Sequence, residues 1–190
     1  MTSHLGASGC GGPVAPIEFA ILSTLFLLRE VEAASSMISA WHLHREAMEL
    51  TWHLPASKSD HMALWTRRTW GCLCGMPSFA CPFHVAAAHN DTLRASAFFR
   101  PGLDTPFFPT RARGVATKLA VVGTFEAIGT AAGMTLLGPT ALRLFGGHTP
   151  RVTGAQVLSA LGIEVSRFRN FACWHGIQAK LFCATPRMPL

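Results

Sequence analysis

One short stretch of the chain alternates apolar and polar side chains, whereas the other apolar segments have compositions typical of helices. Residues 48–54, MELTWHL, alternate apolar and polar side chains and contain Thr51 and Trp52, two residue types that favour strands. The turn sequence PASKSD follows at 55–60, and a second strand-like segment then ends in RRTW at 67–70. The pattern predicts a hairpin, and hence one small antiparallel sheet in a mainly helical α+β domain.

Four segments around this hairpin are expected to form helices. They begin at residues that favour a helix start: a proline at 82, a threonine at 117 and a Thr-Pro pair at 149 and 150. The expected helical segments are 17–36 (as one helix or two), 82–98, 117–133 and 149–161. With no internal repeat or long linker, the chain is expected to form one domain over residues 16–190, after a flexible leader at 1–15.

The composition favours a polyanionic partner and gives no convincing membrane segment. The 190 residues carry a formal net charge of +6 that is spread along the chain, which suits nucleic acid or an anionic surface. The longest apolar run, residues 14–28, contains Pro16 and Glu18 and is shorter than the roughly 20 residues of a spanning helix. We therefore expect an intracellular protein that binds nucleic acid and no membrane.

His148 and Arg151 flank the start of the helix that Pro150 opens. A helix N-terminus offers unpaired N–H groups to an anion, and arginine matches phosphate oxygens with two parallel donors. The pair is therefore a candidate phosphate site. Taken alone, an HxxR pair is more simply a helix-terminal histidine beside a solvated arginine.

Three further motifs accompany this pair in order along the chain. LLREVEAAS, residues 27–35, contains an R-x-x-E pattern, and LPASKSD, residues 54–60, contains one lysine. GGHTPRVTGAQVLSALGIEV, residues 146–165, is followed by a tryptophan at 174. In this order and spacing, the chain resembles the catalytic domain of the tyrosine recombinases, or phage integrases, and their eukaryotic retroelement-type members in particular. The resemblance covers roughly residues 17–182.

The resemblance implies a role for each motif residue in cutting a phosphodiester. Arg29 and Arg151 would neutralise the non-bridging phosphate oxygens as negative charge develops on them. Lys58, on the hairpin, would protonate the departing 5′-oxygen as a general acid. His148 would assist proton movement or bind the phosphate, and Trp174 would pack against it or donate its indole N–H.

The nucleophile of that family is missing, because the chain contains no tyrosine. Eight residues after Trp174 stands Phe182, which has the aromatic ring without the hydroxyl. We therefore expect no tyrosyl–DNA link from this copy, and identical subunits cannot supply one in trans. Cys183 is a poor substitute, since its side chain is shorter and a neighbouring helical position points elsewhere. A decayed copy, a truncated gene model and a fragment of a larger element are the open explanations.

A cluster of cysteines lies directly after the hairpin, in an expected insertion at about residues 70–90. Three thiols and one imidazole within 13 residues suit tetrahedral zinc in a closed, structural site. Buried free thiols and a disulfide are the alternatives, and His89 is a possible replacement ligand. The candidate ligands are Cys72, Cys74, Cys81 and His84.

Several other side chains have a plain interpretation beside a functional one. Arg67 and Arg68 lie beside the hairpin, either facing DNA or forming a solvated strand end. The tryptophans at 41, 52, 65 and 70 are expected to pack in the core rather than to stack on bases. The remaining candidates for phosphate contact, or for mere surface charge, are Arg111, Arg113 and Lys118.

Three interpretations of function follow. The first is a tyrosine-recombinase catalytic domain of a mobile element that acts on double-stranded DNA in integration and recombination, as a nuclear protein that assembles as a homo-oligomer on DNA, with cleavage lost. The second is a non-enzymatic, zinc-stabilised DNA-binding or interaction module. The third is a basic globular protein with coincidental motifs, which the order of the motifs disfavours.

Overall fold

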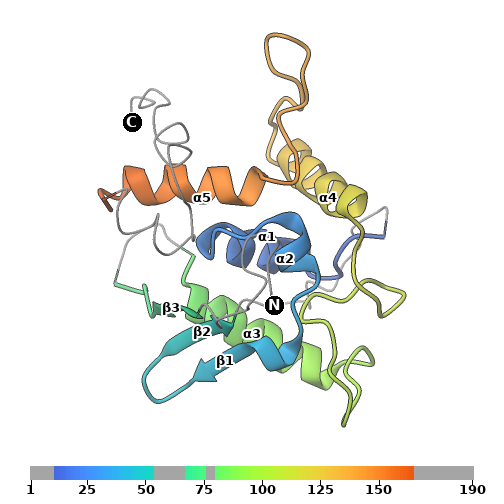
Figure 1. The fold of residues 1–190 in the computed structure, drawn as a ribbon, viewed down its shortest axis with the longest axis vertical. Coiled ribbons are helices and arrows are strands. Elements are labelled where there is room, and N and C mark those ends of the chain that lie inside the picture. The colour runs from blue at the N-terminus through green and yellow to red at the C-terminus, as the bar shows by residue number, and fades with distance from the viewer. Residues whose placement is uncertain (1–10, 54–66, 76–79, 165–190) are drawn as a thin grey trace, which may run out of the picture.

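The computed structural model describes residues 11–53, 67–75 and 80–164 of the chain. Within these ranges the fold combines helices with one three-stranded sheet, which confirms the α+β class (Figure 1). The helices are α1 (Pro16–Leu25), α2 (Glu30–Ala34), the 3-10 turn η1 (Ile38–Ala40), α3 (Pro82–Ala95), α4 (Lys118–Ala131) and α5 (Thr149–Ala160). The strands are β1 (Trp41–His44), β2 (Glu49–His53) and β3 (Arg67–Gly71).

The sheet is antiparallel throughout, in the order β1-β2-β3. The two expected strands are present as β2 and β3, whereas the sequence pattern does not predict β1. Trp41 pairs with Trp52, and Trp52 pairs with Arg68, so these three side chains share one face of the sheet. That face is turned to the core, since Trp41 is 6% exposed and Trp52 is fully buried.

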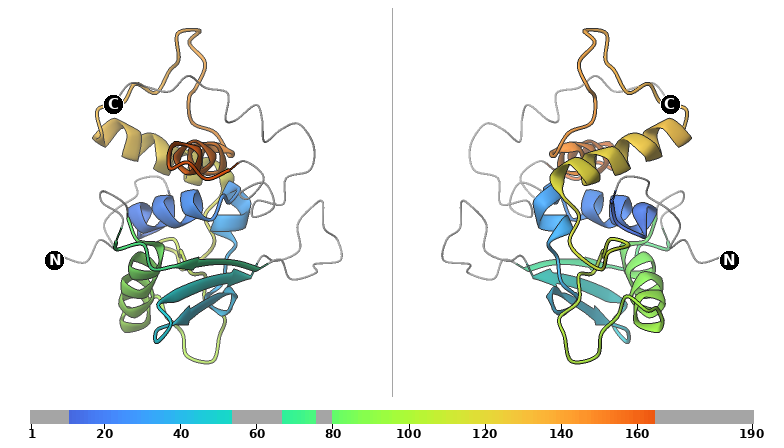
Figure 2. Two further views of the ribbon diagram at one scale, coloured as in Figure 1. Left: turned by 90° about the vertical axis from the view of Figure 1, so that its left-hand side faces the viewer. Right: turned by 90° about the vertical axis from the view of Figure 1, so that its right-hand side faces the viewer.

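Helix α1 is the central element of the fold (Figures 1 and 2). It contacts α5 on one side and α3 on the other, and it also contacts α2 and α4. Helix α3 packs against all three strands. The rings of Trp41 and Phe107 stack with centroids 4.8 Å apart, and Phe19 meets Phe108 edge-on at 5.1 Å. The apolar face of the sheet and the buried side of α1 therefore form one aromatic core.

The tryptophans that the structure describes are packing residues, as expected. The indole N–H groups of Trp41 and Trp52 both donate to the hydroxyl of Ser36, at 2.6 and 2.7 Å. Trp70 is half-buried and donates its indole N–H to the carbonyl of Leu25 at 2.9 Å. Each ring thus keeps a partner for its polar atom while it fills the core.

Helix starts follow the sequence signals closely, with one difference at α5, whereas α3 and α4 end two or three residues before the expected positions. Pro82 begins α3, and the Thr117 hydroxyl caps α4 by accepting the N–H of Ala120 at 3.2 Å. The Thr-Pro pair predicts Thr149 as the cap of α5, but the cap residue is His148. The Thr149 hydroxyl instead accepts a hydrogen bond from the Gly146 N–H at 2.7 Å, and so closes the turn that leads into the helix.

The described end of the expected leader packs on the body of the protein. Val14 and Ala15 are each 2% exposed, and the Val14 N–H donates to the Pro109 carbonyl at 2.9 Å.

In the part of the chain that the structure describes, no helix has the length and apolar character needed to cross a bilayer.

Candidate functional site

Glu32 joins the two arginines that the motifs single out. Its Oε2 atom accepts the backbone N–H of Arg29 at 2.7 Å and the Nη2 group of Arg151 at 2.9 Å. The first bond caps the short helix α2, and the second is an ion pair between side chains that are 10% and 6% exposed. The R-x-x-E pattern therefore serves two purposes, because one carboxylate orders the start of α2 and holds Arg151 from α5.

Arg151 lies in a crowded and largely buried environment. Burial lowers the pKa of its guanidinium, Glu32 opposes this, and the positive charges of Arg68 and Arg29 add to the lowering, with a net pKa of about 10. The group stays protonated at neutral pH. The effects of Arg29 and Arg68 on this pKa also indicate that their guanidinium groups lie close to that of Arg151.

Arg68 is expected from the sequence either to face DNA or to lie at a solvated strand end, and it does neither. It is 1% exposed, and its Nη1 group donates to the carbonyl of Phe26 and, at 3.4 Å, to that of Leu27. Its guanidinium carbon lies 5.5 Å from the ring centre of Trp52. Its neighbour Arg67 is exposed, as the alternation of a strand requires.

Arg29, Arg68 and Arg151 form an arginine cluster. The carboxylate of Glu32 contacts the guanidinium of Arg151, while Glu30 lies 3.6 Å from the ammonium of Lys118. The Nε atom of Arg29 is buried and has no hydrogen-bond partner among the described residues. Neighbouring guanidinium groups, one of them with an unused donor, are suited to an anion such as phosphate.

His148 stands beside this cluster at the start of α5. Its side chain is exposed, and the residue before it is held against α2, where the Glu30 N–H donates to the Gly147 carbonyl at 3.1 Å. A Cβ at Gly147 would come within 2.3 Å of the Glu30 carboxyl carbon. Glycine at 147 thus permits the close approach that brings the amino end of α5 to the arginines.

A second glycine of the same motif brings α5 against α1. A Cβ at Gly154 would lie 2.1 Å from the backbone oxygen of Thr24 and 2.5 Å from the Leu27 side chain. The two helices therefore touch through backbone at this point, as small residues allow. Gly147 and Gly154 of GGHTPRVTGA are thus accounted for by helix docking, which carries Arg151 to Glu32.

The structure brings Arg29, His148 and Arg151 to one region of the fold. The other predicted members of the site, Lys58, Trp174 and Phe182, lie outside the described residues.

The cysteine cluster is also assembled in space. The Cys72 and Cys81 sulfurs are 3.8 Å apart, and the His84 Nδ1 atom lies 3.8 Å from Cys72 and 3.2 Å from both Cys74 and Cys81. All four ligand atoms lie within 4.8 Å of one another. With metal–sulfur bonds of about 2.3 Å, the sulfur–sulfur edge of a zinc tetrahedron is about 3.8 Å, so the four residues fit this ion.

The pKa values of two thiols in the cluster, those of Cys81 and Cys74, are shifted in opposite directions. Burial raises the pKa of Cys81, but hydrogen bonds with His84 and from the Leu73 N–H outweigh it and lower that pKa to about 6. The pKa of Cys74 is raised to about 11, first by its hydrogen bond with Cys72 and then by desolvation. A thiolate at the start of α3 that accepts a backbone N–H has the environment of a metal ligand.

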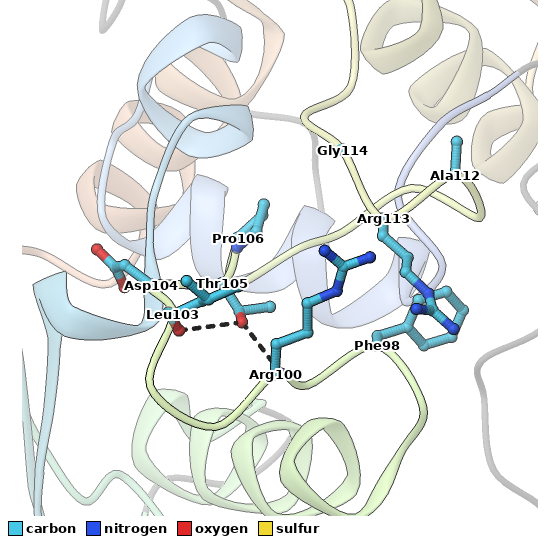
Figure 3. Close-up of a pocket in the computed structure, with 9 residues that line it drawn as sticks. All are labelled: Phe98, Arg100, Leu103, Asp104, Thr105, Pro106, Ala112, Arg113 and Gly114. Atoms are coloured by element: carbon cyan, nitrogen blue, oxygen red, sulfur yellow. Dashed lines mark hydrogen bonds between the residues drawn. The ribbon is translucent and has the colours of Figure 1, made fainter.

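A separate pocket of about 250 Å³ lies in the loops after α3 (Figure 3). Arg100, Asp104 and Arg113 are among its lining residues, and none of the cluster arginines is. Asp104 is already engaged, since its carboxylate accepts the Ser39 hydroxyl at 2.6 Å and the Ser39 N–H at 3.2 Å. The pocket therefore offers a less concentrated charge than the arginine cluster.

The fold is similar to that of a site-specific recombinase. The XerH recombinase bound to palindromic difH substrate, in a post-cleavage complex, matches with a TM-score of 0.63 and 14% identity, over 88% of this chain and 41% of that one. The same recombinase in a pre-cleavage complex with difH substrate matches with a TM-score of 0.64 and 13% identity, over 93% and 44%. The chain spans less than half the length of these proteins.

Sequence comparison adds nothing to this, as neither a protein-family model nor a curated protein matches. The architecture is that of a tyrosine-recombinase-like domain, in agreement with the fold that the motif order predicts.

Proposed function

We propose that this chain binds double-stranded DNA through the arginine cluster, as a recombinase-like domain. The observation that carries the proposal is the closeness of Arg29 and Arg68 to Arg151, with an unused donor on Arg29. A phosphodiester carries a negative charge and accepts several charge-assisted hydrogen bonds. The similarity in fold to a recombinase in complex with its substrate supports the same assignment.

The wider role follows from the motif resemblance. We propose that the domain derives from a mobile element and serves DNA integration and recombination, in the nucleus and as a homo-oligomer on DNA. Arg29, Arg151 and His148 would hold the phosphate, and Lys58 and Trp174 would complete the site. Phenylalanine at 182, in the position of the nucleophile, leaves this copy able to bind DNA but not to cut it.

Binding to a DNA duplex across a salt series tests the proposal. Because loss of a buried ion-pair partner is strongly destabilising, the informative double variant is Arg29→Ala with Arg151→Lys, which keeps a charge opposite Glu32. It should bind more weakly and lower the slope of log affinity against log salt by about 0.9 for each phosphate that the variant no longer neutralises.

The matched control is Arg45→Ala with Arg143→Lys, which changes the net charge by the same amount. Arg45 and Arg143 have exposed side chains and pair with Asp91 and Glu126. Absence of binding by the wild type, or equal weakening in both double variants, would rule out the arginine cluster as the DNA site.

We also propose that Cys72, Cys74, Cys81 and His84 hold a structural zinc ion. Four protein ligands leave no open position for a substrate, so the ion would fasten the end of β3 to the start of α3. Metal analysis of the purified chain should find one zinc per molecule. His84→Ala should lose it, whereas His44→Ala, at an exposed histidine on β1, should retain it. Equal metal content in the two variants would contradict the assignment.

The second candidate function is a DNA-binding or interaction module with no catalytic ancestry in use. The cysteine cluster and Phe182 favour it, since neither contributes to strand cleavage. The two functions share the arginine cluster and differ in whether the rest of a cleavage site is intact.

A further inference from the structure

The carboxyl end of α1 is an unusual turn. Its closing hydrogen bonds run from the Leu28 N–H to the Ser23 carbonyl at 2.8 Å and from the Leu27 N–H to the Thr24 carbonyl at 3.1 Å. This is the Schellman pattern, in which the residue after the cap is usually glycine. Here that residue is Leu27, with φ +53°, a left-handed conformation that a side chain disfavours.

Three side chains from distant elements hold this turn in place. Strand β3 contributes Trp70, which donates to the Leu25 carbonyl at 2.9 Å, and Arg68, which donates to the carbonyls of Phe26 and Leu27. Helix α5 contributes Arg151, whose Nε group donates to the Leu27 carbonyl at 2.9 Å. Carbonyls at the end of a helix lack partners within it and carry partial negative charge, so arginine is well suited to them.

The turn decides where Arg29 lies. Leu27 is two residues before Arg29, and its carbonyl is shared by Arg68 and Arg151. The same oxygen therefore ties β3 and α5 to the segment that carries the first arginine of the phosphate site. The interactions of Arg68 make it part of the support for both other arginines.

We propose that Arg68 is a positioning residue of the phosphate site: it holds the Leu27 turn so that Arg29 and Arg151 converge on one phosphate. It also places a third positive charge close to Arg151. This inference rests on the proposed function, because Arg68 would support the residues that bind the phosphate in the same DNA site.

The test is a double-mutant cycle on affinity for a DNA duplex. Arg68→Met removes the charge and the donors but keeps much of the stem, and it should weaken binding by about tenfold or more. In the background of Arg29→Ala with Arg151→Lys it should weaken binding little further, because the groups that it positions are already altered. Arg68→Lys, with the charge but without the fork of donors, should bind at an intermediate level.

The control for general destabilisation is Leu93→Ala. Leu93 is fully buried in α3, so its loss lowers the melting temperature while leaving the arginines intact. Its DNA affinity should stay at the wild-type level. A folded Arg68→Met that binds like the wild type, or one whose effect adds in full to that of the double variant, would overturn the positioning role.

Two failures can be told apart. Where Arg68→Met does not fold, Arg68→Lys decides, and a wild-type affinity in that variant overturns the inference. Where the wild type binds no DNA, or ignores the changes at Arg29 and Arg151, the proposed function itself fails. The inference about Arg68 fails alone when those changes weaken binding and the changes at Arg68 do not.

Discussion

The carboxylate of Glu32 and the guanidinium of Arg151 form an ion pair of 2.9 Å between residues 119 positions apart in the sequence. Glu32 also accepts the backbone N–H of Arg29, so a single side chain orders both arginines of the candidate phosphate site. The R-x-x-E spacing has a physical reason here, since three positions along a helix start let a side chain turn back to cap its own helix.

Glu32→Gln should therefore destabilise the protein. The amide keeps the shape and one acceptor but leaves the buried Arg151 charge without its counterion, which should lower the free energy of unfolding by about 3–5 kcal/mol. Denaturant unfolding measures this. Glu126→Gln is the control, because its partner Arg143 is 65% exposed and an exposed pair contributes at most about 1 kcal/mol. Equal losses in the two variants would contradict the special role of Glu32.

Gly154→Ala should disrupt the docking of α5 on α1. The added Cβ would lie 2.1 Å from the Thr24 oxygen, a backbone atom that cannot rotate away, so a loss of about 2 kcal/mol or more is expected in the free energy of unfolding. Denaturant unfolding of the variant measures this loss.

Gly123→Ala is the matched control for this change. Gly123 lies within α4, and a Cβ at this position would have nothing within 4 Å, so alanine should stabilise the helix by about 0.5–1 kcal/mol. If both substitutions changed the free energy of unfolding by the same sign and size, the docking of α5 would not depend on close packing at Gly154.

The residues of the site differ in how well sequence predicts them. Arg29, Glu32 and Arg151 belong to motifs with fixed spacings at helix starts, where a short segment determines the geometry. Arg68 belongs to none of the motifs. Its burial depends on how β3 pairs with β2 and on which face of the sheet meets α1, and neither can be deduced from a short segment of sequence. One signal does point to it: residues two apart in a strand share a face, and Trp70 marks the inner one.

The missed strand β1 illustrates the same limit. Its four residues, WHLH, alternate apolar and polar side chains, but a run of four is the shortest that predicts a strand, and two of the four are histidines. Their extended conformation is stabilised by pairing with β2, which places Trp41 opposite Trp52. Long-range pairing of this kind is a tertiary effect that local propensity does not report.

His89 should make stability depend on pH. It is 3% exposed and lies 2.6 Å from the Phe107 carbonyl, to which its Nε2–H donates; burial lowers its pKa, against the weaker effects of that carbonyl and of Glu18. The unfolded chain therefore binds more protons than the folded one below pH ~6.5, and stability falls as pH falls through that value.

Unfolding experiments at a series of pH values check this. His89→Gln, which retains a donor for the Phe107 carbonyl, should reduce the loss of stability on acidification. His44→Gln, at an exposed position, should leave the pH dependence as in the wild type. An unchanged profile in His89→Gln would show that this histidine does not titrate with unfolding.

Removal of the proposed zinc ion should weaken DNA binding as well as stability. Cys72 directly follows β3, and β3 carries Arg68, so release of the ion would loosen the strand that supports the Leu27 turn. A chelator should lower both the melting temperature and the DNA affinity of the wild type. The affinity of His84→Ala should already be low and should not respond to the chelator. An equal response in both proteins would show that the chelator acts elsewhere.

Phe182→Tyr separates the two candidate functions. If Arg29, Lys58, His148 and Arg151 still form a cleavage site, restoring the hydroxyl supplies the missing nucleophile, and incubation with duplex DNA should give a covalent protein–DNA adduct that survives denaturant. Wild type should give none. Leu181→Tyr, which adds the same group one position earlier, should also give none, because attack on phosphorus requires alignment as well as a hydroxyl.

The adduct should in turn disappear when Lys58→Ala is combined with Phe182→Tyr, since the leaving 5′-oxygen then lacks its acid. Phe182→Tyr that binds DNA with wild-type affinity and forms no adduct would favour the non-enzymatic module. In that case the arginine cluster serves to hold a phosphate, and Lys58 and the restored tyrosine are not aligned for cleavage.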